Sequence, residues 1–120
     1  MGSHYLQVAR GIRKSSLIIT VAAAATPENL YLVSAGGTVP RTVIVRKIMC
    51  YSDVGNCIVD IGIGLGVAFA NIIPSILVIN TFDTEWMEDE IPEVEVNANI
   101  TVQSSILGVQ VQIEVEEIGT

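Results

Sequence analysis

Hydrophobic and polar residues alternate most regularly near the C-terminus of the chain. The hydrophobic positions are Val109, Val111, Ile113 and Val115, and the polar positions are Gln110, Gln112, Glu114 and Glu116. A period of two residues is typical of a β-strand that buries one face and exposes the other. Segment 97–103 alternates in the same way, and small polar residues follow it. We therefore expect these two strands to form a hairpin.

Further strands are expected along the rest of the chain. Segments 42–51 and 57–63 flank a run of residues that tolerate a positive φ angle, which predicts a second hairpin. The other strand candidates are segments 17–25, 30–33, 75–79 and 81–87. Turns recur at roughly the spacing seen in sandwiches, and no stretch has the helical period. The pattern predicts an all-β chain, a single β-sandwich of about eight antiparallel strands with a jelly-roll-like arrangement.

Composition places these strands in one domain. A chain of 120 residues is close to the commonest domain size, and half of its residues are hydrophobic while 16% are charged. We expect the sandwich to span residues 15–118, after an N-terminal arm or expression-tag remnant at residues 1–14. Segment 10–25 superficially fits a secretory signal, but its β-branched residues favour a strand. No apolar run reaches the roughly 18 residues of a membrane span, so no membrane partner is expected.

Charge and chemistry exclude several classes of function. A net charge of −7 repels a phosphate backbone, so nucleic-acid binding is not expected. His4 is the only histidine, and it lies in the expected arm, so a serine or cysteine triad has no base. Together with two cysteines it makes a poor zinc site. We therefore expect no enzymatic activity, no metal and no cofactor.

Three local patterns each leave alternatives. Cys50 and Cys57 flank the central turn, where a disulfide is geometrically possible, although buried reduced thiols are favoured. Glycines at 62, 64 and 66 do not complete a dinucleotide-binding motif, so a sharp bend or a close backbone approach is the better explanation. The acidic run from Asp83 to Glu95 is interpreted as a solvated face, ahead of calcium binding or glycoside hydrolysis. Trp86 and the tyrosines leave sugar binding as a minor alternative.

The order of segments resembles that of small β-sandwich virion proteins of tailed phages and prophages, of the decoration, head-fibre or tail-associated type. The matching segments are 29–33 with its glycine turn, 42–49, 91–94 leading into 99–104, and 109–117. The resemblance implies a non-enzymatic structural or capsid-binding role, commonly as a trimer. It also implies a capsid or tail protein as a second partner, and a location in the virion if the chain is phage-encoded, otherwise in the cytoplasm.

Two sets of residues are candidates for such contacts. Apolar residues crowd the irregular segment 64–73, which is interpreted as a loop, a bent strand or one helical turn. Its candidate subunit-interface residues are Leu65, Val67, Phe69, Ile72 and Ile73. Arg10, Arg13 and Lys14 form the second set, a basic arm expected to dock on an acidic surface of the assembly. The main hypothesis is a homo-oligomeric structural protein, and the alternative is a carbohydrate- or ligand-binding module.

Overall fold

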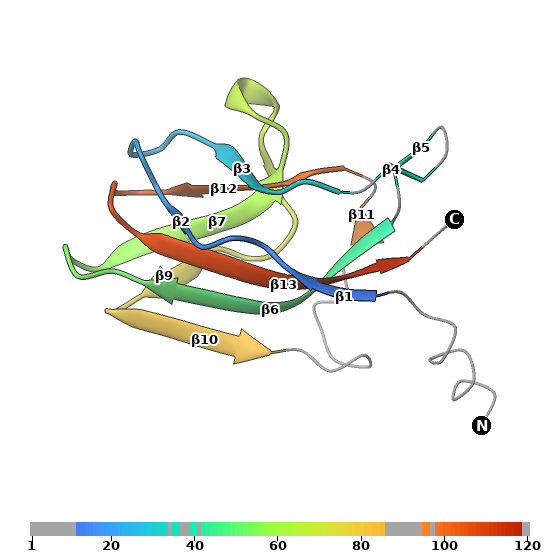
Figure 1. Cartoon of the computed structure of the whole chain (residues 1–120). Helices are drawn as coiled ribbons and strands as arrows, with labels where there is room; N and C mark the ends of the chain where they lie inside the picture. Colours follow the sequence, from blue (N-terminus) through green and yellow to red (C-terminus); the bar gives the residue numbers. More distant parts are fainter. Residues whose placement is uncertain are drawn as a thin grey trace.

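The protein is a sandwich of two antiparallel β-sheets (Figure 1). The computed structural model describes residues 12–33, 35–36, 39–40, 42–85, 95–96 and 98–118. The strands are β1 (Ile12–Ser15), β2 (Ile19–Thr20), β3 (Glu28–Tyr31), β4 (Ala35–Gly36), β5 (Val39–Pro40), β6 (Thr42–Tyr51), β7 (Cys57–Ile63), β8 (Ala70–Asn71), β9 (Ile76–Val78), β10 (Thr81–Glu85), β11 (Glu95–Val96), β12 (Ile100–Ser104) and β13 (Gln110–Ile118). A 3₁₀ turn, η1 (Gly66–Ala68), lies between β7 and β8.

The strand order is that of a jelly roll. One sheet, called sheet A, has the order β1-β13-β6-β10, with β2 beside β13 and β11 beside β6. The other, sheet B, has the order β3-β12-β7-β8, with β9 beside β7. If β4, β5 and β11 are set aside, ten of the thirteen described strands remain, and they count as eight when β1 with β2 and β8 with β9 are each taken as one interrupted strand. In chain order the sheets then read 1-8-3-6 and 2-7-4-5. This confirms the predicted fold class.

Alternating residues of both sheets fill the space between them. In β13 and the residue before it, the four hydrophobic positions of the alternation are fully buried. They pack with residues of sheet B such as Val59, Ile61, Ile100 and Val102, which are also fully buried. Each buried aliphatic side chain of this kind contributes about 1.5–3 kcal/mol of transfer free energy. The core is therefore aliphatic, as the alternation indicated.

Both predicted hairpins are wrong. β12 belongs to sheet B and β13 to sheet A, and β6 and β7 are divided between the sheets in the same way. Each pair crosses from one sheet to the other instead of bonding along an edge. Alternation shows only which side chains face the interior. A strand has such an inward face both when the next strand is its neighbour in the same sheet and when the next strand lies in the facing sheet. The pattern could not distinguish the two arrangements.

The N-terminal part of the sandwich also differs from expectation. The strand predicted over 17–25 is reduced to β2, because residues 22–26 form an exposed turn in which Ala25 has a φ angle of 53°. Alanine side chains have little apolar surface to bury, so they do not hold this segment in the sheet. Ile12, the first described residue, already belongs to sheet A although it lies in the stretch expected to be an arm, and β1 pairs with β13 from Ile12 opposite Glu117.

Candidate functional site

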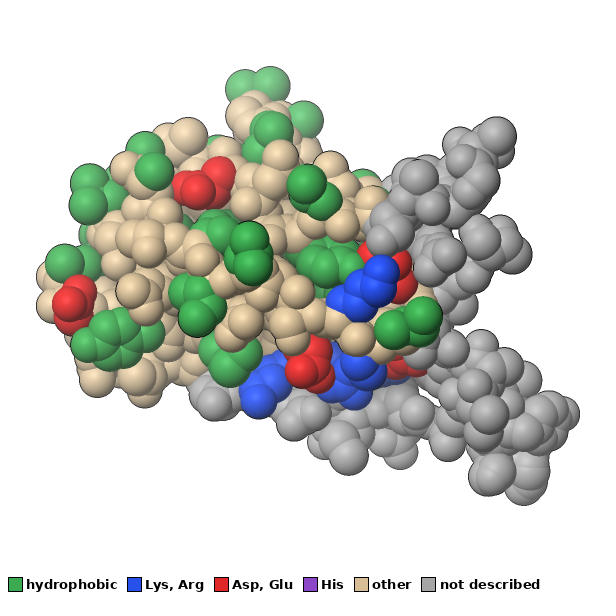
Figure 2. All heavy atoms as spheres, viewed as in Figure 1, with side chains coloured by type: hydrophobic (Ala, Val, Ile, Leu, Met, Phe, Trp, Pro, Cys, Tyr) green, Lys and Arg blue, Asp and Glu red, His purple; other side chains and the backbone are tan. Residues whose placement is uncertain are grey.

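A loop between β7 and β8 projects from the sandwich with hydrophobic side chains at its tip. Val67 is fully exposed and Leu65 is 49% exposed. Figure 1 shows the loop extending beyond sheet B, and Figure 2 shows hydrophobic side chains gathered on the same projection. Exposed aliphatic side chains on a projecting loop are typical of a contact surface. The structure thus exposes two of the five interface residues predicted from the sequence.

The other three predicted interface residues lie closer to the core. Ile73 is 5% exposed and belongs to the hydrophobic core, and Ile72 packs against that core. Phe69 is half-buried, with its ring against the backbone of Gly62. The crowded apolar segment is therefore divided between an exposed tip and a buried base.

Glycines and backbone hydrogen bonds fix the shape of this loop. A Cβ atom on Gly62 would lie 2.2 Å from the carbonyl oxygen of Ala70, so only glycine lets the returning chain approach this closely. Gly64 has a φ angle of 86°, and its carbonyl accepts a hydrogen bond of 2.9 Å from Thr101 Oγ1. The amide of Ala68 donates to the carbonyl of Leu65 over 3.1 Å, closing the 3₁₀ turn. The close backbone approach expected from these glycines is confirmed.

The basic residues of the expected docking arm are placed in different surroundings. Arg13 and Lys14 lie in β1, while Arg10 falls outside the described residues. The guanidinium of Arg13 pairs with the carboxylate of Glu114. Lys14 Nζ lies 3.4 Å from Glu117 Oε1. Both cations therefore attach β1 to β13, and their side chains remain 45% and 38% exposed.

Glu117 of β13, next to β1, is a buried acid at this end of the sandwich. The side chain of Glu117 is fully buried, and its carboxylate accepts a hydrogen bond from the hydroxyl of Tyr31 on β3. Burial raises the pKa of Tyr31 above its ordinary value, and the neighbouring carboxylate raises it further. Tyr31 therefore keeps its proton and remains a donor. The contact ties sheet A to sheet B, and sequence reasoning missed it because strand alternation carries no information about contacts between sheets.

A second buried charge pair lies in the middle of sheet A. The register between β6 and β13 shifts between Glu114 and Val115, which face Lys47 and Val45 respectively. Arg46 is thus an extra residue in β6, a β-bulge. Its Nε donates to Glu116 Oε1 over 3.1 Å, and both residues are buried. Pairing keeps the two charges compatible with burial.

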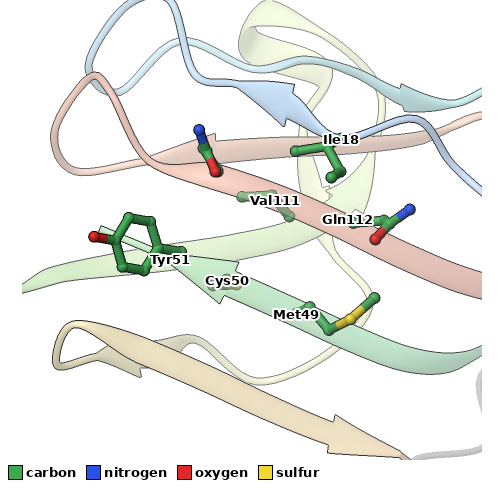
Figure 3. Close-up of a pocket in the computed structure, with 7 residues that line it drawn as sticks. Ile18, Met49, Cys50, Tyr51, Val111 and Gln112 are labelled. Carbon is green, nitrogen blue, oxygen red and sulfur yellow. The ribbon is translucent and has the colours of Figure 1, made fainter. Parts of the chain in front are cut away.

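The outer face of sheet A carries a shallow hollow of about 190 Å³ (Figure 3). Met49 and Tyr51 of β6, Gln112 of β13 and Ile18 line it. Ile18 is 63% exposed and Tyr51 is 42% exposed, so the hollow is open to solvent. Its surface combines aliphatic, aromatic and amide groups.

An apolar groove of about 350 Å³ lies between the edges of the two sheets. The β1–β2 segment, with Leu17 and Ile19, forms one side of the groove. β3 and Leu32 form the other side, and Leu30 and Tyr31 also line the groove. Leu17 and Leu32 are 84% and 64% exposed. The groove joins residues distant in sequence, so only the fold brings them together.

The cysteines are free thiols on facing sheets. Cys50 is the last residue but one of β6 in sheet A, Cys57 begins β7 in sheet B, and both are buried. Burial raises the pKa of the Cys50 thiol to about 12, with a smaller contribution from Cys57. A thiol that stays protonated is a poor nucleophile. This arrangement agrees with the interpretation of the pair as buried reduced thiols.

The described residues provide no grouping that suggests metal chemistry. In this part of the chain, no three His, Cys, Asp or Glu side chains gather as a metal site requires. The acidic run from Asp83 to Glu95, with Trp86 inside it, falls outside the residues whose side chains are described. No helix in the described part of the chain has the length and hydrophobicity to cross a membrane.

Comparisons with known proteins find a structural similarity but no family. No family model matches the chain, and no curated protein matches it. A matching solved structure is a chain of the Bacillus endospore appendages, described as a novel family of disulfide-linked pili. The two chains are 13% identical, the match covers 90% of this chain and 88% of that chain, and the TM-score is 0.45. A similarity of this size does not by itself indicate a function for this chain.

Proposed function

We propose that the protein is a non-enzymatic structural subunit that assembles with copies of itself. The supporting observation is the number of large hydrophobic side chains that a well-packed sandwich leaves exposed. In the described part of the chain there are twelve of them: Ile12, Leu17, Ile18, Leu32, Tyr51, Val54, Ile58, Leu65, Val67, Leu77, Ile79 and Leu107. Permanent interfaces between subunits are richer in such side chains than transient ones.

The position of these side chains favours assembly over incidental exposure. Ile58 on β7 and Leu77 on β9 are direct cross-strand neighbours on the outer face of sheet B, 46% and 61% exposed. Ile18 and Tyr51 share the hollow on sheet A. Two outward faces and a projecting loop therefore each present apolar groups. Since the chain carries a net charge of −7, copies that meet through uncharged surface avoid electrostatic repulsion.

A finer form of the proposal rests on the layout resemblance to phage proteins alone. In this form the subunit is a virion component, a capsid-decoration or tail-associated protein, that forms a homotrimer and contacts a capsid or tail protein. It would then reside in the virion, or in the cytoplasm if the chain is not phage-encoded. Binding to purified capsids or tails tests this form separately from self-assembly.

One observation favours a second candidate, a carbohydrate-binding module. The hollow on sheet A places the exposed ring of Tyr51 beside the amide groups of Gln110 and Gln112. An aromatic face with neighbouring amides can stack on a sugar ring and hydrogen-bond its hydroxyls. Retention on immobilised glycans that is lost in Tyr51→Ala would support this candidate, and equal retention of the variant would count against it.

Sedimentation velocity over a range of concentrations tests the main proposal. The expected result at micromolar concentration is a species heavier than the 12.8 kDa chain, whose share grows with concentration. A single 12.8 kDa species throughout would contradict it.

A further inference from the structure

The projecting loop is a preformed apolar knob. The amide of Phe69 donates to the carbonyl of Gly66 over 3.2 Å, and Thr101 anchors Gly64 at the base. Little conformational entropy would therefore be lost when the loop is held by a partner. The stretch from Ile61 to Phe82 contains no charged residue, so the loop can be buried without desolvating a charge.

The groove between β1–β2 and β3 has the size and surface to receive such a loop. Its volume is about 350 Å³. An apolar protein cavity of roughly 150 Å³ accommodates benzene, so this groove has room for more than one aliphatic side chain. Leu17 and Leu32 stand on its two sides and are largely exposed in the single copy. A bound apolar loop would cover both.

A contact between the two surfaces would bury no charge, because the residues that line the groove and those of loop 64–69 are all uncharged. All described basic residues lie in sheet A, while the charged side chains of the sheet B strands are Glu28 and Asp60. Asp60 is linked to the base of the loop, because Asn71 Nδ2 donates to its carboxylate over 2.9 Å. Arg13, whose guanidinium is paired with Glu114, lies in β1 close in sequence to Ser15 and Ser16 of the groove, and Glu28 precedes Asn29 on the other side. The rim of the groove therefore carries charges of both signs, and the contact depends on the apolar fit of an uncharged loop in an uncharged groove.

We propose that the loop of residues 64–69 in one copy inserts into the groove between β1–β2 and β3 of a second copy. This inference rests on the proposed self-assembly and names the two surfaces involved. Because loop and groove consist of different residues, the contact is heterologous, and each copy both offers a knob and receives one. Such contacts form a ring, for example a trimer, if their rotation closes, and a filament if it does not.

The test uses one variant for each surface and a matched control. Val67→Asp alters the knob at a fully exposed position, and Leu32→Asp alters the groove at a 64% exposed one. Asn56→Asp, at an exposed polar position in the turn between β6 and β7, adds the same charge away from both surfaces. Sedimentation velocity is measured for each variant alone and for an equimolar mixture of the first two, with circular dichroism to verify folding.

Each altered surface is expected to weaken self-association by about tenfold or more, since burial of one valine or leucine corresponds to about that factor in Kd. The control should assemble like the wild type. In the mixture, the intact loop of Leu32→Asp meets the intact groove of Val67→Asp, so a one-to-one heterodimer should form. Wild-type-like assembly of Val67→Asp, or no heterodimer, would overturn this inference while leaving self-assembly intact. A monomeric wild type would instead overturn the proposed function and the inference together.

Discussion

Replacement of Tyr31 by phenylalanine tests the contact that joins the two sheets at the β1 end. The Tyr31 hydroxyl donates to Glu117, whose side chain is fully buried. Phenylalanine keeps the ring and its packing but removes the donor. The carboxylate then remains buried with one hydrogen bond fewer, while the amine of Lys14 stays 3.4 Å away.

The size of the effect follows from the charge on the acceptor. Hydrogen bonds to charged groups contribute about 1.5–3 kcal/mol to stability, more than bonds between neutral groups. For a domain of this size, 1 kcal/mol corresponds to about 4 °C in Tm. Tyr31→Phe is therefore expected to lower the free energy of unfolding by about 1.5–3 kcal/mol and Tm by about 6–12 °C.

Urea denaturation followed by circular dichroism measures the change. Tyr51→Phe is the matched control, because Tyr51 is exposed on the outer face of sheet A, and we expect it to stay within about 0.5 kcal/mol of the wild type. Equal stability of the two variants would refute the idea that the Tyr31–Glu117 contact holds the sheets together.

Three further predictions concern other features of the fold. Gly62→Ala should destabilise by about 3 kcal/mol or more in urea denaturation, because its Cβ would overlap the backbone carbonyl of Ala70. Gly66→Ala should cost less, about 1–2 kcal/mol, because its Cβ meets open space and only its φ of 60° is unfavourable. Cys50, with a pKa near 12, should resist alkylation in the folded protein at pH 8, as judged by intact mass. Because its folded pKa is raised above the ordinary 9.0, stability should fall as pH rises from 9 toward 12. Partial burial would raise the pKa of Asp60, but hydrogen bonds from Ser75, Asn71 and Gln103 lower it below 3.8. Stability should therefore fall as pH drops below 3.8, less steeply in Asp60→Asn.

The β-sandwich could be predicted from the sequence because strand alternation is a local signal. Val109 to Val115 reported the buried face of β13 correctly, since each side chain's orientation depends only on its place in the strand. Which strand lies next to which is a non-local property. The crossing from β12 in sheet B to β13 in sheet A left no mark in either segment, and a hairpin was wrongly expected.

The candidate site was predictable only in part, for the same reason. Apolar crowding identified segment 64–73 but could not separate exposed Val67 from buried Ile73, because both are aliphatic and the chain returns to sheet B between them. The groove was missed because Leu17 and Leu32 follow two different strands, β1 and β3, that only the fold brings together. Arg13 and Lys14 stood out as basic, yet their partners Glu114 and Glu117 lie about a hundred residues away.

Amide hydrogen exchange, compared between concentrated and dilute protein, tests the central claim that copies assemble through the surfaces described. When the protein is concentrated, amide exchange should slow in the loop around Val67 and along the groove near Leu32, and it should stay unchanged at Asn56 in the turn between β6 and β7. Identical exchange at both concentrations throughout the chain would contradict the account.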